Sequence, residues 1–245
     1  FGVISGDNVT LDSSLGVGLF ADANVGNGKT VGLQGFTLAG AKSSNYELVN
    51  PTDVRGSIGK KTLTISGVSA ADKTYNANTA AILLYNNPTL VGIVAADAGN
   101  GIGFTNGTGN FATRNVGNGI TVTGSGFALT GTGTGNYTLA QPGGMSANIT
   151  PAPLSMTITG NPTRVYNGST NANIESGDVT IVGWQGTEGG TITQSAGATY
   201  ASKDAGSRTV TALIEASDFS LNGGTTLSNY SFQSSITGLG TIAQA

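Results

Sequence analysis

The stretch Asn45-Tyr46-Glu47-Leu48 recurs as Asn136-Tyr137-Thr138-Leu139 and again as Asn229-Tyr230-Ser231-Phe232. The period is about 90 residues, so the chain repeats one unit instead of forming a single large domain. A second stretch keeps the same period: residues 23–31 (ANVGNGKTV) match residues 114–122 (RNVGNGITV). Residues 203–210 (KDAGSRTV) form a weaker third copy.

A third anchor sets the boundaries of the repeats. Residues 73–80 (KTYNANTA) return as residues 164–172 (RVYNGSTNA) and have no counterpart before the first copy. Each repeat closes at an isoleucine: Ile58, Ile149 and Ile242. We therefore expect a piece of a longer tandem array, with an N-terminally truncated repeat at 1–59 and complete repeats at 60–150 and 151–245.

Alternating hydrophobicity predicts that each complete repeat opens with a β-strand. Residues 62–66 (TLTIS) and 154–159 (LSMTIT) have the period of two that is typical of a strand with one buried face. The Asn-Gly dipeptides at 27–28 and 118–119 predict hairpin turns, because both positions of a type I′ turn need positive φ. The side chains predicted to point inward are Leu63, Ile65, Leu154, Met156 and Ile158.

No long window has a helical apolar stripe, and the density of Gly, Thr and Asn disfavours helices throughout. The expected fold class is all-β, with tandem small β-sandwich-like modules of about 90 residues in an elongated array. A continuous β-solenoid is the alternative. Its coil period of roughly 20–30 residues is not found in the sequence.

The composition excludes several classes of partner. The chain has 40 glycines, 10 basic and 13 acidic residues and a net charge of -3, without a basic cluster. It therefore lacks the electrostatic pattern of a protein that binds nucleic acid or an anionic membrane. It also has no apolar run long enough to span a bilayer and no signal-peptide pattern, so we expect no membrane insertion and an export signal outside this sequence.

The sequence has no His and no Cys, which removes the commonest general base, a common metal ligand and the thiol nucleophile. We expect no catalytic residues, no cofactor and no bound metal. Three other sites stay open as alternatives: a carboxylate pair such as Glu175 and Asp178 in a hydrolase, a calcium site near Asp7 and Asp12, and an isopeptide bond from Lys73 to an Asn.

Trp184 is the only tryptophan and breaks the repeat pattern. With Gln185 and Glu188 it forms a candidate glycan-binding site, because an indole ring can stack on a sugar while polar neighbours bind hydroxyl groups. The competing interpretation places Trp184 in the core of the third repeat. The tyrosines of the Asn-Tyr stretch are likewise expected to serve the fold.

At these anchors the chain resembles the YDG/MBG-type repeats of very large exported bacterial adhesins, including those of filamentous-haemagglutinin type secreted by a two-partner system. The resemblance covers nearly the whole chain. The chain departs from the Tyr-Asp-Gly triplet that gives the family its name, because both copies have Asn at the second position and one has Ala at the third. The matching stretches are Tyr75-Asn76-Ala77, Tyr166-Asn167-Gly168, residues 6–11, the Val-Gly-Asn-Gly stretches, the Asn-Tyr stretches and residues 149–154.

The resemblance implies a stalk or spacer in a protein of adhesion, aggregation or biofilm, secreted or held at the bacterial cell surface in association with the outer membrane. The implied partners are neighbouring repeats of the same chain and extracellular polysaccharide or glycans of host and bacterial surfaces. The alternative function is a carbohydrate-binding module that recognises polysaccharide through Trp184.

Overall fold

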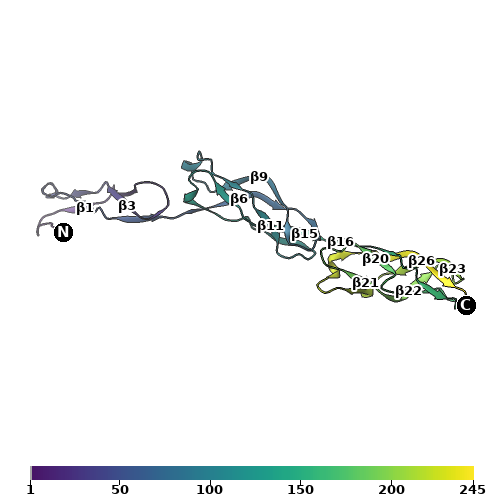
Figure 1. Ribbon diagram of the computed structural model, residues 1–245. Coiled ribbons are helices and arrows are strands. Elements are labelled where there is room, and N and C mark those ends of the chain that lie inside the picture. The colour runs from purple at the N-terminus through teal and green to yellow at the C-terminus, as the bar shows by residue number, and fades with distance from the viewer. Residues whose placement is uncertain (1) are drawn as a thin grey trace. The chain divides into compact units, whose positions relative to one another are not determined.

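A computed structural model of the chain describes residues 2–245, including every side chain among them except those of Ser195 and Ala196. These residues form β-strands and short 3-10 turns and contain no α-helix (Figure 1). The predicted all-β class is confirmed. The chain divides into two compact units, and each unit combines residues from two successive repeats.

The first unit holds the chain up to Ser66 together with residues 89–106 and 127–141. Two antiparallel pairs lie here, and β3 is flanked by two strands. The strand β14 runs parallel to the start of β6, where Thr138 lies opposite Thr62. The strands are β1 (Thr10–Asp12) with β4 (Thr37–Ala39), β10 (Gly103–Thr105) with β13 (Ala128–Thr130), β2 (Val17–Phe20), β3 (Gly26–Gln34), β5 (Arg55–Ile58), β6 (Lys61–Ala70) and β14 (Tyr137–Leu139).

The second unit begins with a five-stranded sheet from the second repeat. Its order is β7-β15-β12-β11-β8, and the parallel pair β15 and β7 sets Thr150 opposite Thr74. The strand β9 (Leu83–Val91), like β6, runs on from one unit into the other. The strands of the sheet are β7 (Lys73–Thr74), β8 (Ala80–Ala81), β11 (Thr108–Phe111), β12 (Gly117–Ser125) and β15 (Met145–Thr150).

The third repeat completes the second unit with one large mixed sheet and two small pairs. The large sheet has the order β19-β22-β23-β26-β17-β20, and β18 also pairs with β26. The large sheet consists of β17 (Ser155–Ile158), β18 (Thr163–Val165), β19 (Asn171–Ile174), β20 (Val179–Val182), β22 (Gln194–Tyr200), β23 (Gly206–Leu213) and β26 (Ser235–Ala243). The pairs are β16 (Ala152–Pro153) with β25 (Tyr230–Ser231), and β21 (Gly190–Ile192) with β24 (Phe219–Leu221).

The strands β17 and β26 approach each other closely at one point. Ile158 lies opposite Gly238, and a Cβ on Gly238 would sit 2.3 Å from the Ile158 carbonyl oxygen. Only glycine fits this crossing, because any side chain would push the two strands apart.

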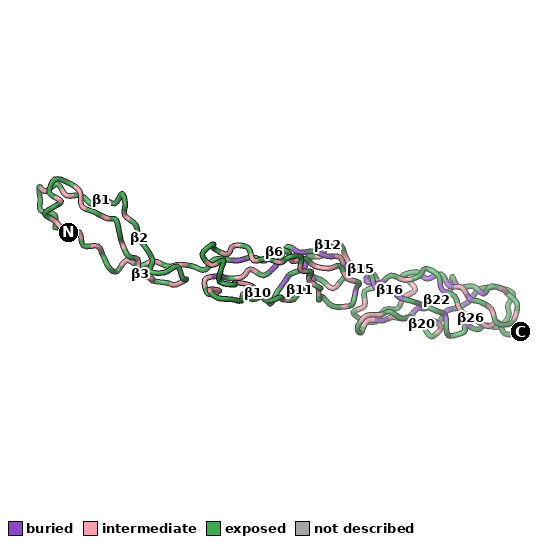
Figure 2. Tube along the Cα trace, turned by 90° about the horizontal axis from the view of Figure 1, so that it is seen from above, coloured by how far each residue is buried: buried purple, intermediate pink, exposed green. Residues whose placement is uncertain are grey.

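The alternation seen in the sequence corresponds to burial in the structure. Leu63, Leu154, Met156 and Ile158 are buried, and Ile65 is half-buried. Residues 2–59 contain no buried side chain, whereas buried residues are frequent in the second unit (Figure 2). Hydrophobic stabilisation therefore concentrates in the second unit.

The predicted hairpin turns at the Asn-Gly dipeptides are wrong. Gly28 and Gly119 do have positive φ, 61° in each case, but they lie inside β3 and β12, where the strand register shifts. Each dipeptide therefore forms a β-bulge, which uses the same left-handed glycine conformation as a type I′ turn. The amide of Gly119 donates a hydrogen bond of 2.8 Å to Asn148 Oδ1 and closes the second bulge.

Two hydrophobic clusters form the core of the second unit. One lies within the third repeat and includes Ile192, Val210 and Ala212. The other takes Tyr75, Phe111 and Ile149 from the second repeat and Leu154 and Tyr230 from the third. The junction between these two repeats is therefore built as a hydrophobic core.

Candidate functional site

A tyrosine and a carboxylate pair in the same way in all three repeats. The hydroxyl of Tyr46 donates a hydrogen bond of 2.7 Å to Asp7 Oδ2 and accepts one of 3.0 Å from the amide of Ile4. Tyr137 donates to Asp97 Oδ2 at 2.6 Å and accepts from the Val94 amide at 3.2 Å. Charged acceptors strengthen such bonds.

The third copy of this pair involves two of the candidate glycan-binding residues. Tyr230 donates to Glu188 Oε2 at 2.6 Å and accepts from the Gln185 amide at 3.1 Å. In each repeat the acid lies three residues after the donating amide, and 39 to 42 residues before the tyrosine. Glu188 is thus the structural counterpart of Asp7 and Asp97.

The asparagine before the tyrosine makes contacts across each junction between repeats. At the first junction, the amide of Val25 donates to Asn136 Oδ1 at 2.9 Å, and Asn136 Nδ2 donates to Asn24 Oδ1 at 3.1 Å. The asparagine amide group therefore satisfies one donor and one acceptor of the preceding repeat.

The second junction repeats this contact with the same atoms. Val116 N–H donates to Asn229 Oδ1 at 2.9 Å, and Asn229 Nδ2 donates to Asn115 Oδ1 at 3.1 Å. Asn229 is 1% exposed, so water cannot replace these partners.

The Glu188 side chain is buried at the second junction and has three partners. It is 5% exposed; Oε1 accepts a 2.7 Å hydrogen bond from the Tyr75 hydroxyl and lies 3.1 Å from Arg114 Nη2. With Tyr230 on the other oxygen, the carboxylate is paired and hydrogen-bonded, as a buried charge must be. Tyr75 and Arg114 belong to the second repeat, so Glu188 joins two repeats.

The pKa values of these hydroxyl groups follow from this environment. Burial, together with the hydrogen bond to Glu188, raises the pKa of Tyr230 to about 12. The same two causes raise the pKa of Tyr75, and the hydrogen bond to Asp97 raises the pKa of Tyr137. At neutral pH each tyrosine is therefore a neutral donor facing a carboxylate.

Trp184 is half-buried in an aromatic cluster at the second junction. Its ring centroid lies 4.8 Å from that of Tyr230 and 6.4 Å from that of Phe219, with edge-on geometry in both pairs. The side-chain amide of Gln185 donates to the Gly183 carbonyl at 2.9 Å. The structure thus brings Trp184, Gln185 and Glu188 together, and all three make contacts within the protein.

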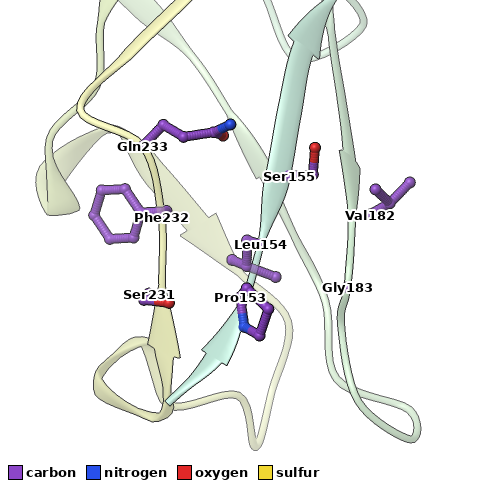
Figure 3. Close-up of a pocket in the computed structure, with 8 residues that line it drawn as sticks. All are labelled: Pro153, Leu154, Ser155, Val182, Gly183, Ser231, Phe232 and Gln233. Atoms are coloured by element: carbon purple, nitrogen blue, oxygen red, sulfur yellow. The ribbon is translucent and has the colours of Figure 1, made fainter.

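An open groove of about 440 Å³ lies beside this cluster, between β16–β17 and the chain after β25 (Figure 3). Gln233 extends toward β17, where its Oε1 accepts a 3.3 Å hydrogen bond from the Met156 amide. Phe232, the aromatic residue in the groove lining, packs its ring on Phe219 at 4.8 Å. The groove therefore presents no free aromatic platform for a sugar ring.

The remaining candidates from the sequence have local partners. Lys73 Nζ donates to carbonyl and amide oxygens, including Asn76 Oδ1 at 2.8 Å and Asn78 O at 2.7 Å, and burial lowers its pKa. Within residues 2–245 no carboxylate forms a salt bridge with Lys73, so an isopeptide bond would lack its acid. Glu175 N–H donates to Asp178 Oδ2 at 2.9 Å and closes a turn.

The acidic pair considered for calcium is also held locally. Asp7 accepts the Tyr46 hydroxyl, and Asp12 Oδ1 accepts the amide of Ser14 at 2.9 Å. Across the described part of the chain, no three His, Cys, Asp or Glu side chains come together in a group able to hold a metal. No helix in this part of the chain is long and apolar enough to cross a membrane.

Sequence reasoning missed the partners Asp97, Arg114 and Asn115. A usable signal was present, because Asp7, Asp97 and Glu188 precede their tyrosines by a nearly constant interval. The asparagine contacts also recur at a nearly constant separation, 111 residues between Val25 and Asn136 and 113 between Val116 and Asn229. Repetition alone does not show that these stretches of successive repeats touch.

The YDG domain family matches three successive stretches, residues 1–54, 59–144 and 150–238. The chain belongs to the YDG domain family. It carries three YDG repeats; the second and third matches span about 90 residues each, as the periodicity predicts, and the first match is shorter. No curated protein and no solved structure shows a significant match to the chain.

Proposed function

We propose that the three YDG repeats act as a structural spacer in a secreted or surface-anchored bacterial adhesin, in a protein of adhesion, aggregation or biofilm. The same asparagine contact at both junctions carries this proposal. A contact made by equivalent atoms at successive junctions couples each repeat to the next, as in other repeat arrays.

The chemistry of the second junction supports a structural role over a binding role. Trp184 packs on Tyr230 and Phe219, and Glu188 has hydrogen bonds on both oxygens. A ligand would have to displace these contacts and leave the buried Glu188 carboxylate without its partners. The low content of charged residues, 9%, also limits nonspecific electrostatic contacts of an exposed spacer.

The spacer proposal includes no catalytic role. The chain has neither His nor Cys, and its acidic residues at 175, 178 and 188 serve turns and the junction. A spacer needs only a fixed length and coupled repeats.

A replacement experiment in the intact parent protein tests the proposal. We expect adhesion to fall when the three repeats are deleted, and to return when an unrelated folded spacer of similar length takes their place. Retained adhesion after deletion would contradict a spacer role, and a failure of the unrelated spacer to restore adhesion would assign binding to the repeats.

The proposed location at the cell surface has its own test. Antibodies against the repeats should label intact cells that produce the protein.

A binding experiment on the chain itself covers the carbohydrate alternative. The chain and its Trp184→Ala variant are titrated with a panel of bacterial and host polysaccharides. We expect no saturable binding by either protein. Saturable binding that the variant loses would replace the spacer proposal with glycan recognition through Trp184.

A further inference from the structure

The tyrosine that opens the eponymous triplet contacts the next repeat. Tyr75 is 1% exposed, donates to Glu188 of the third repeat and packs edge-on against the Tyr230 ring with a centroid distance of 5.4 Å. Its ring therefore belongs to the face of the second repeat that the third repeat covers.

The corresponding tyrosine of the third repeat, Tyr166, has the same backbone placement. The Tyr75 amide donates to the Thr150 carbonyl at 2.8 Å, and the Tyr166 amide donates to the Ala243 carbonyl at 2.9 Å. Both tyrosines follow a short strand that runs parallel to the last strand of its repeat. Yet Tyr166 is 41% exposed, whereas Tyr75 is 1% exposed.

The rest of this face recurs as well. At the second junction the face consists of Tyr75, Arg114, Asn115 and Val116, and its counterparts in the third repeat are Tyr166, Lys203, Asp204 and Ala205. Lys203 is exposed and makes no salt bridge within residues 2–245.

Each of these counterparts keeps the chemistry that the contact needs. Lys203 keeps the positive charge of Arg114 for a carboxylate. Asp204 keeps a side-chain oxygen that accepts from an asparagine Nδ2, and Ala205 keeps a backbone amide that donates to its Oδ1. The Ala205 amide makes no hydrogen bond with any described residue.

The first junction offers a comparison on the side of the following repeat. Ala23 stands there at the position of Arg114. A cavity of about 200 Å³ lies beside Asp97 and Tyr137, the counterparts of Glu188 and Tyr230. At the second junction, Arg114 and Tyr75 lie next to the equivalent carboxylate, that of Glu188.

We propose that the face formed by Tyr166, Lys203, Asp204 and Ala205 is a docking surface for another YDG repeat. The partner presents an Asn-Tyr stretch and a loop carboxylate, as the third repeat presents Asn229, Tyr230 and Glu188 to the second. Tyr166 and Lys203 then contact the carboxylate, and Asp204 and Ala205 contact the asparagine. The inference follows from the junction geometry and does not depend on where the protein is located.

An extended chain tests this docking. A second copy of residues 151–245 is fused directly after Ala243, the residue that occupies the place of Thr150 at the second junction. In the added copy Tyr166 is replaced by Phe, so that the original Tyr166 gives a distinct peptide. Nitration by tetranitromethane is then followed by mass spectrometry in the original and the extended chain.

We expect Tyr166 to react readily in the original chain and as slowly as Tyr75 in the extended chain. Replacing the two contact residues of the added copy, Asn229→Ala with Glu188→Gln, should return Tyr166 to its original rate. Limited proteolysis verifies that the added copy is folded in both versions. Equal nitration of Tyr166 in the original and extended chains with a folded added copy would overturn the proposal, as would protection that survives the double replacement.

Discussion

Replacing Asn229 with Ala should strongly loosen the second junction. The substitution removes the acceptor of the Val116 amide and the donor to Asn115 Oδ1. Asn229 is 1% exposed, so no water takes the place of the lost groups.

The magnitude follows from the two lost hydrogen bonds. A buried donor left without a partner costs about 1–3 kcal/mol, and the second lost bond adds about 1 kcal/mol. The opening free energy of the junction should therefore fall by about 2–4 kcal/mol. Because each 1.4 kcal/mol is a factor of ten, the exchange of the Val116 amide should accelerate from about thirtyfold to several hundredfold.

Native-state hydrogen exchange of the Val116 amide is the direct assay, since repeat arrays do not unfold in one two-state step. Fluorescence of Trp184, which packs on Tyr230, reports the same junction in a urea titration. The chain supplies matched controls: Asn136→Ala removes the same bonds at a half-buried position, and Asn45→Ala removes a side chain without a hydrogen-bond partner among residues 2–245.

The expected order of destabilisation is Asn229→Ala, then Asn136→Ala, then Asn45→Ala with almost none. Water can replace part of what Asn136 loses, which limits its cost to about 1 kcal/mol. Equal effects at the three positions, or unchanged exchange of the Val116 amide in Asn229→Ala, would show that the asparagine contact does not hold the junction.

Three further changes give separate tests. The pKa of Tyr230 is about 12 in the folded chain and about 10 in the unfolded chain. The stabilisation that the Tyr230 hydroxyl contributes is therefore complete below pH 10 and falls as the pH rises toward 12. In Tyr230→Phe the urea midpoint should depend less on pH across that range. Gly238→Ala forces a Cβ against Ile158 and should lower the stability of the third repeat by about 1–3 kcal/mol in urea unfolding, whereas Gly223→Ala, with open space around it, should change little. Trp184→Ala loses two aromatic contacts and should cost about 2 kcal/mol by the same assay, and an unchanged midpoint would show that the indole does not contribute to the junction.

The sequence predicted the repeat, the strand class and the buried alternation because these are local or periodic properties. Identical short stretches at a fixed spacing need no three-dimensional information to detect. Strict alternation predicted five inward side chains; Leu63, Leu154, Met156 and Ile158 are buried, and Ile65 is half-buried.

The Asn-Gly prediction was wrong for a physical reason. A type I′ turn and a β-bulge both need a residue with positive φ, and glycine at position 119 satisfies either. The choice depends on whether a strand continues beyond the dipeptide. Here β12 continues to Ser125 and pairs with β15, which the dipeptide alone cannot indicate.

The role of Glu188 at the junction could not be predicted from the sequence, because its partners are distant in sequence and its counterparts are a different residue type. Glu188 was considered as a sugar ligand because it lies near Trp184, whereas in the structure it accepts from Tyr75 and Tyr230. Its acid counterparts in the other repeats are aspartates, so the three acids do not align as identical residues.

The first two positions of the Tyr-Asp-Gly triplet make different contacts, and this difference explains why the second position can change. The first position reaches the following repeat, as Tyr75 does at Glu188. The second position acts within its own loop, where Asn76 Oδ1 accepts from Lys73 and Asn167 Oδ1 accepts from the Ser169 amide at 3.1 Å. An asparagine oxygen accepts these local hydrogen bonds as an aspartate oxygen would. Replacing Asp with Asn at the second position therefore preserves the loop and leaves the tyrosine free to join one repeat to the next.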